Sequence, residues 1–123
     1  MADPLDDGIK FFNSGQYFEA HEAWEDLWRS EHGPLRPFYQ GLVQAAVAMH
    51  HRSRGNTSGT RAQLLKSLAK LSQYPPDTAG IDVASLRQDL RQILDGRAVE
   101  GTGEVRIIRL KTKSIVVESD GTS

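Results

Sequence analysis

The chain of 123 residues contains no cysteine, which excludes a disulfide framework and any metal site built from thiolates. A metal ion would have to be held by histidine, carboxylate or amide side chains. No apolar run reaches the roughly 18 residues that a membrane-spanning helix needs, and residues 1–7 lack the basic start and apolar stretch of a signal peptide. We therefore expect a cytoplasmic protein with no membrane partner.

Charge of neither sign is in excess. The 15 Lys and Arg against 16 Asp and Glu give a formal net charge of -1, so we expect no nucleic-acid partner. An anionic ligand remains compatible with the sequence only at a local basic group, Arg52, Arg54 and Arg61. Arg52 and Arg54 also suit the carboxyl end of a helix, where cations complement the helix dipole.

Turn and capping residues divide most of the chain into five predicted helices, and we expect an all-α fold, a compact bundle. The helices run from Pro4 to a stop at 13–15, from Gln16 to about Ser30, from Leu35 to Ser53, from a cap at Thr57 or Ser58 to a break at 74–77, and from a cap at Asp82 to Gly96. Residues 41–49 of the third helix are apolar nearly all round, which is typical of a helix at the centre of a bundle.

The pattern changes at residue 104. Residues 105–110 and 115–117 are rich in β-branched side chains and are separated by a polar stretch at 111–114, which predicts one or two short strands and a candidate hairpin. We therefore divide the chain into a helical-bundle domain, 1–103, and a C-terminal extension, 104–123, disordered at its end. Because a lone hairpin is marginal in water, the extension should dock on the bundle, pair with another subunit in a homo-oligomer, or remain mobile. Its high apolar content favours the first two outcomes.

The second helix places two ionisable residues within its apolar arc. At 100° per residue, His21 and Glu25 fall between Trp28 and Phe18, while Trp24 lies near the centre of the arc. Both tryptophans are expected to anchor the core. A buried charge costs free energy unless it is paired, and a carboxylate four residues from an imidazole makes such a pair. His21 and Glu25 therefore indicate a candidate functional site.

The third helix offers a second polar stripe. Gln40, Gln44, Val47 and His51 lie within about 60° of one another around its axis. The short connection after Ser30 favours antiparallel packing of the second and third helices, which would direct this stripe toward the first pair.

If the helices pack in this way, His21, Glu25, Gln44 and His51 converge. Two imidazoles and a carboxylate suit a divalent transition metal, so the predicted metal ligands are His21, Glu25 and His51. The candidate catalytic residues are His21 and Glu25, either in metal-assisted hydrolysis of an unknown small substrate or with His21 transferring a proton and Glu25 orienting it. Glu22 is either an acid at the rim or a solvated side chain.

Two other interpretations stand beside this one. A His, Glu and Gln network can hold two helices in register with no ligand at all. Residues 13–20 also resemble half of a tetratricopeptide unit, which would make the chain a non-enzymatic scaffold with a protein partner. The string 21–25 is similar to the helix motif of zinc proteases, but Glu25 stands where that motif has its second histidine.

Residues 12–28 and 38–48, with His51 and 54–56, resemble the domain of unknown function family 309 in order, spacing and residue type. The resemblance covers about the first 75 residues and implies a small all-α fold with no settled activity. The motif residues that it carries over are His21, Glu22, Trp24, Glu25, Gln40, Gly41, Gln44, His51, Gly55 and Asn56. The candidate ligand-binding residues are Glu22, Gln40, Gln44, Arg54 and Asn56.

Overall fold

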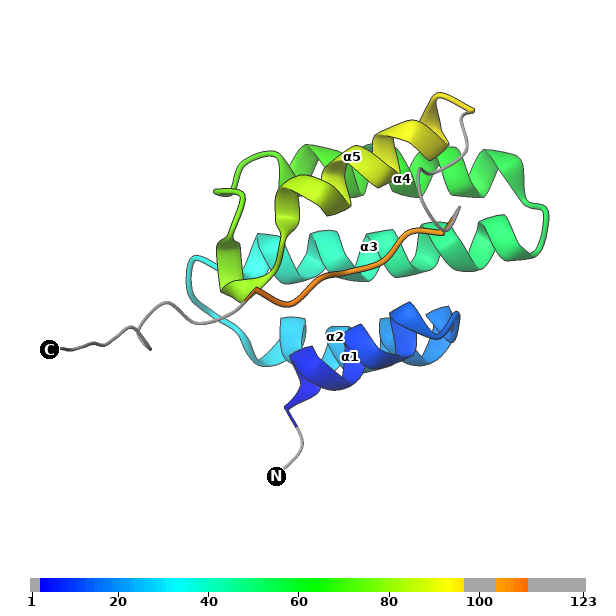
Figure 1. The fold of residues 1–123 in the computed structure, drawn as a ribbon. Helices are drawn as coiled ribbons and strands as arrows, with labels where there is room; N and C mark the ends of the chain where they lie inside the picture. The colour runs from blue at the N-terminus through cyan, green and yellow to red at the C-terminus, as the bar shows by residue number, and fades with distance from the viewer. Residues whose placement is uncertain (1–2, 97–103, 111–123) are drawn as a thin grey trace, which may run out of the picture.

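The computed structural model describes residues 3–96 and 104–110, and this part of the chain is an all-α bundle of five α-helices and one short 3-10 helix, as the sequence predicts (Figure 1). The elements are α1 (Pro4–Asn13), α2 (Tyr17–Ser30), α3 (Arg36–Ser53), α4 (Thr57–Leu71), η1 (Thr78–Gly80) and α5 (Val83–Leu94). Successive α-helices pack against one another, with α3 between α2 and α4 and with α5 on α4.

Two of the predicted helix caps are confirmed. The Asp3 side chain accepts a hydrogen bond from the backbone N–H of Leu5, and Asp82 accepts one from Ser85, each at 3.0 Å. These bonds satisfy amide groups that have no partner within the helix.

The cap predicted for α4 is wrong by one or two residues. Asn56, not Thr57 or Ser58, accepts the bond from the Gly59 N–H, at 3.0 Å. The reason is the turn before it: Gly55 has a φ of 75°, and the Asn56 N–H bonds back to the carbonyl of His51 at 2.9 Å. This turn places Asn56 at the N-cap position of α4.

The central position predicted for the third helix is confirmed. The residues that α3 buries are Phe38, Tyr39, Gly41, Leu42, Ala45, Ala46, Ala48 and Met49. At Gly41 the helix comes close to α4: the Ser67 hydroxyl donates to the Gly41 carbonyl at 2.7 Å, and an added Cβ would lie 3.0 Å from Leu71.

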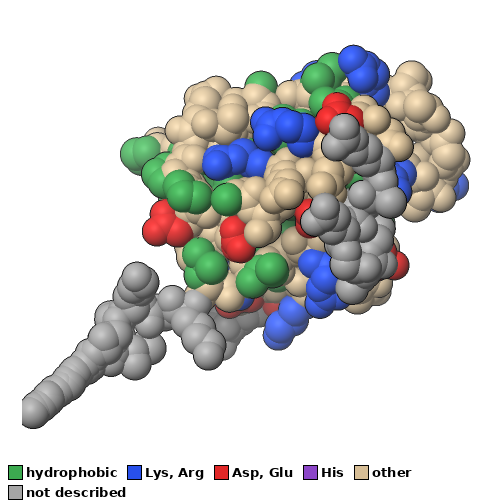
Figure 2. Space-filling view, turned by 45° about the horizontal axis from the view of Figure 1, so that its top comes forward, with side chains coloured by type: hydrophobic (Ala, Val, Ile, Leu, Met, Phe, Trp, Pro, Cys, Tyr) green, Lys and Arg blue, Asp and Glu red, His purple; other side chains and the backbone are tan. Residues whose placement is uncertain are grey.

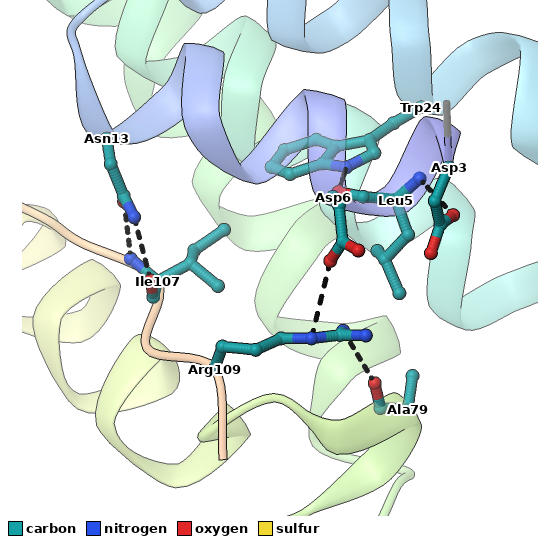
Figure 3. Close-up of polar contacts among 8 residues, drawn as sticks. All are labelled: Asp3, Leu5, Asp6, Asn13, Trp24, Ala79, Ile107 and Arg109. Atoms are coloured by element: carbon teal, nitrogen blue, oxygen red, sulfur yellow. Dashed lines mark hydrogen bonds and ion pairs between the residues drawn. The ribbon is translucent and has the colours of Figure 1, made fainter. Parts of the chain in front are cut away.

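Trp24 anchors the core, as expected. It is fully buried, and its indole N–H donates to the carbonyl of Leu5 at 3.2 Å (Figure 3). A Cβ at Gly8 would overlap the indole ring, so α1 can cross Trp24 only where it carries a glycine. This contact sets the approach of α1 to α2.

Trp28 differs from the expectation because it is only partly buried. The Arg36 guanidinium lies 4.6 Å from the centre of its ring and donates to the Trp28 carbonyl at 3.0 Å. Trp28 lies near the end of α2, where it packs against the edge of the core and the cation at the start of α3 covers its ring.

Docking of the C-terminal extension is confirmed for residues 104–110, which run along the bundle toward η1 (Figure 1). Val105 and Ile107 are 3% and 2% exposed. The predicted strand is not formed in this stretch, which makes one antiparallel bridge, Ile81 with Arg109. The ladder cannot continue because α5 begins two residues after Ile81. Residues 115–117 lie outside the described part, so the hairpin and subunit exchange stay predictions.

Candidate functional site

His21, Glu25 and Arg29 form a row along one face of α2. His21 Nε2 lies 3.7 Å from Glu25 Oε2, and Arg29 Nη2 lies 3.3 Å from Glu25 Oε1. The side chains of His21 and Glu25 are 23% and 30% exposed, so the pair is at the edge of the core and not sealed inside it. The reason is that Ala20 and Trp24 occupy the inward face of the helix.

Phe18 is 51% exposed and takes no part in the core, which corrects its place in the apolar arc. The centre of its ring lies 5.6 Å from that of His21 and 5.9 Å from that of His50. Phe18 therefore links an imidazole of α2 to an imidazole of α3.

These rings border a cavity of about 170 Å³, lined by Phe18, His21, Val47 and His50. A cavity of this size is sufficient for one aromatic ring. His50 is the functional candidate that the sequence analysis missed. Its spacing of three residues from Val47 was the available signal, because residues three apart share one face of a helix.

Two buried polar atoms of α2 and α3 have no hydrogen-bond partner among residues 3–96 and 104–110: Nδ1 of His21, which lines this cavity, and Oε1 of Gln44, which does not line it. Gln44 precedes Val47 by about one turn of α3. A buried polar atom without a partner costs about 1–3 kcal/mol, so native structures rarely retain one without a ligand, a water molecule or another reason. If His21 Nε2 carries its proton toward Glu25, Nδ1 is an acceptor, as Gln44 Oε1 is.

The predicted metal set of His21, Glu25 and His51 is not assembled. Within the described ranges no group of three His, Asp or Glu side chains is placed to hold a metal ion. His51, in the last turn of α3, has its Nδ1 atom 3.2 Å from Nδ2 of Asn56, the residue that caps α4. His50, about 100° away around the helix, faces α2 in its place.

The proposed ligand-binding residues are dispersed. Glu22 is exposed, and Gln40 is partly buried on α3, one turn before Gln44. Arg54 and Asn56 lie in the α3–α4 turn, where Asn56 caps α4, and neither lines this cavity. The structure therefore brings His50 to the same cavity as His21, keeps Glu25 beside His21, and leaves Arg54 and Asn56 elsewhere.

No helix of the described residues is long and apolar enough to cross a membrane. On the face that Figure 2 shows, Lys and Arg side chains lie in separate groups between hydrophobic and acidic ones and form no continuous basic surface there. This arrangement agrees with the nearly balanced charge of the chain.

The fold and the cavity between α2 and α3 together define a small all-α domain of helical hairpins with a partly exposed His–Glu pair on its second helix. Residues 5–63 match the model of the family "Domain of unknown function (DUF309)", which confirms the resemblance seen in the sequence.

Two similar proteins are themselves uncharacterised. An uncharacterised protein of Aquifex aeolicus (strain VF5) is 25% identical over 96 residues, which are 77% of this chain and 29% of the relative. The uncharacterised protein YpuF of Bacillus subtilis (strain 168) is 33% identical over 61 residues, 49% of this chain and 35% of the relative. The matched segments thus span about a third of each relative's length.

Several of the residues that match the family motif have a role in folding in this structure. These are Trp24 in the core, Gly41 at the α3–α4 contact, Gly55 in the turn, Asn56 at the cap and His51 beside it. The fold does not account in this way for His21, Glu22, Glu25, Gln40 and Gln44. This second set lies on α2 and α3.

Proposed function

We propose that this domain binds a small planar molecule that carries N–H donors, in the cavity between α2 and α3. The observation that supports the proposal is a pair of buried acceptors without partners among the described residues: His21 Nδ1, on a residue that lines the cavity, and Gln44 Oε1, about one turn of α3 before Val47, which also lines it. A ring of the ligand would stack against Phe18 and His50, and its N–H groups would satisfy the two acceptors.

The charges along α2 limit the ligand further. Glu25 contributes a carboxylate, and the neighbouring Arg29 offsets part of its charge. An anionic group would meet two acceptors and a carboxylate, so a neutral or cationic ligand fits better. Phe18 is half exposed, so a change of its rotamer would admit the ligand.

The same site would support proton transfer by His21. With its Nε2 held toward Glu25, the imidazole has one nitrogen left to accept a proton from the bound molecule, and Glu25 would stabilise the resulting imidazolium. We therefore propose binding as the function and proton transfer as the chemistry that His21 and Glu25 add to it. No step through a metal ion is included, because the predicted ligand set is not assembled.

Benzamidine and benzoate provide a matched pair of probes, since they share one ring and differ in carrying donors or acceptors. The protein, labelled for NMR, is titrated with each. We expect benzamidine to shift the signals of the His21 imidazole and the Gln44 side-chain amide in a saturable way, and benzoate to produce weaker shifts or none. Saturable binding of benzoate alone, or of neither probe at millimolar concentration, would reject the proposal.

Variants locate the binding. His21→Phe and Gln44→Leu each remove one acceptor and should weaken benzamidine binding, whereas Glu19→Gln, at an exposed position of α2, should not. If all three variants behave alike, the probe binds elsewhere. That result would favour the alternative in which the His, Glu and Gln side chains only hold α2 and α3 in register and a partner protein binds at another surface.

A further inference from the structure

A second and larger cavity, of about 300 Å³, lies where α3 ends, α4 begins and α5 ends. The residues that line it are Arg52, Gly55, Thr57, Thr60, Arg61, Leu64, Ile93, Leu94 and Gly96. None of them belongs to the cavity between α2 and α3. Its volume is at the lower end of the range of small-molecule sites.

Two exposed cations, Arg52 and Arg61, border this cavity. In the described part of the chain neither Arg52 nor Arg61 makes an ion pair or a side-chain hydrogen bond. The first turn of α4 also carries no acidic residue. Among the described residues, these two positive charges therefore have no ion-pair partner.

The first turn of α4, where Thr57 lines the cavity, supplies further donors. Asn56 satisfies the N–H of Gly59, whereas the N–H groups of Thr57 and Ser58 have no hydrogen-bond acceptor among the described residues. Thr57, which lines the cavity, also has a hydroxyl that is unbonded in this part of the structure, while the Thr60 hydroxyl already donates to the Asn56 carbonyl at 2.7 Å. The start of α4 thus adds its dipole to the two guanidinium groups.

Part of the cavity lining is apolar. Leu64 is 1% exposed, and Ile93 and Leu94 are partly buried hydrophobic residues packed against the core. Free inorganic phosphate would leave this apolar part in contact with water. A ligand with an anionic end and an apolar body would contact both the cations and the apolar part.

We propose that this cavity binds a small phosphate monoester, with its phosphate against Arg52 and Arg61 and its apolar body against Leu64 and Ile93. Phosphate fits better than carboxylate because its three terminal oxygens can accept from two guanidinium groups and from Thr57 together.

Phenyl phosphate is the probe that tests the proposal, with inorganic phosphate and phenol as its two halves. Calorimetric titration should give saturable binding of phenyl phosphate, binding of inorganic phosphate weaker by about tenfold, and no binding of phenol. The backbone amides of Thr57 and Ser58 should shift with the same affinity. Equal binding of inorganic phosphate would overturn the role of the apolar part of the lining, and no saturable binding of phenyl phosphate would overturn the site.

Matched arginine variants separate a built site from general surface charge. Arg52→Gln and Arg61→Gln should each weaken phenyl phosphate binding by about tenfold or more, since a charged hydrogen-bond donor is lost. Arg54→Gln removes the same charge two residues from Arg52, at a position that does not line the cavity, and should change the affinity by less than about twofold. An equal effect at Arg54 would overturn the proposal.

The thermal unfolding midpoint of each variant shows that a loss of binding is not a loss of fold. His21→Phe should bind phenyl phosphate as the unsubstituted protein does. The two cavities are thereby tested independently, and failure of one proposal leaves the other in place. Loss of phenyl phosphate binding in His21→Phe would contradict the assignment to this cavity.

Discussion

Asn13 and Ile107, which are 94 positions apart in the sequence, are joined by two hydrogen bonds of 2.8 Å (Figure 3). The Asn13 amide donates to the Ile107 carbonyl, and its oxygen accepts from the Ile107 N–H. Nearby, Arg109 pairs with Asp6 at 3.3 Å and donates to the Ala79 carbonyl at 3.1 Å. Side chains of α1 therefore hold the extended segment where a strand partner would otherwise be needed.

The first prediction concerns this attachment. Asn13→Ala leaves the N–H and carbonyl of the buried Ile107 without partners, which should lower the free energy of unfolding by about 1–3 kcal/mol. Arg109→Gln is the comparison, because its ion pair with Asp6 is 44% exposed on both sides and should contribute less than about 1 kcal/mol. Urea unfolding measures both. An Arg109→Gln effect as large as that of Asn13→Ala would contradict this ranking.

The second prediction concerns the crossing of α1 over Trp24. Alanine is usually better than glycine inside a helix, but Gly8→Ala places a Cβ on the indole ring and should destabilise the protein by about 1–3 kcal/mol. Trp24→Phe makes room, so the double variant should lose less than the sum of the single losses. Additive losses in urea unfolding would show that the ring and the helix do not meet at this point.

The third prediction separates the fold from the site. Because His21 and Glu25 are partly exposed, His21→Leu combined with Glu25→Leu should lower the free energy of unfolding by less than about 1 kcal/mol, or raise it, since the unpartnered His21 Nδ1 is removed. The same double variant should lose benzamidine binding. A loss of several kcal/mol would instead identify the pair as a structural element, as in the alternative that the sequence left open.

The fourth prediction concerns pH. Burial raises the pKa of Tyr17 above 10.0, the charge of Glu104 raises this pKa further, and Arg52 lowers it. Since the folded state favours the neutral phenol, this contribution to stability is complete below pH 10 and is lost as the pH rises through the higher folded-state pKa. NMR titration of the Tyr17 ring should show a further rise of its pKa in Arg52→Gln. An unchanged or lowered pKa would contradict the proximity of Arg52.

Much of the local structure could be predicted from the sequence. Asp3 and Asp82 were recognised as caps because capping depends on a few adjacent residues. The environment of Trp28 was not predictable, since the cover that it receives from Arg36 depends on the path of the loop between α2 and α3. Asn13 was interpreted only as part of a helix stop, and its bond to Ile107 has no signal in the neighbouring sequence.

In the candidate site, too, some features could be predicted from the local sequence and others depend on the tertiary structure. Periodicity along one helix is a local property, so the sequence alone was sufficient to put His21 and Glu25 on one face of α2 and to predict α3 as the central helix. The rotation of α3 against α2 depends on every packed side chain, including the close contact of Gly41 with α4. That rotation, which only the folded molecule establishes, places His50 in the site and leaves His51 beside Asn56.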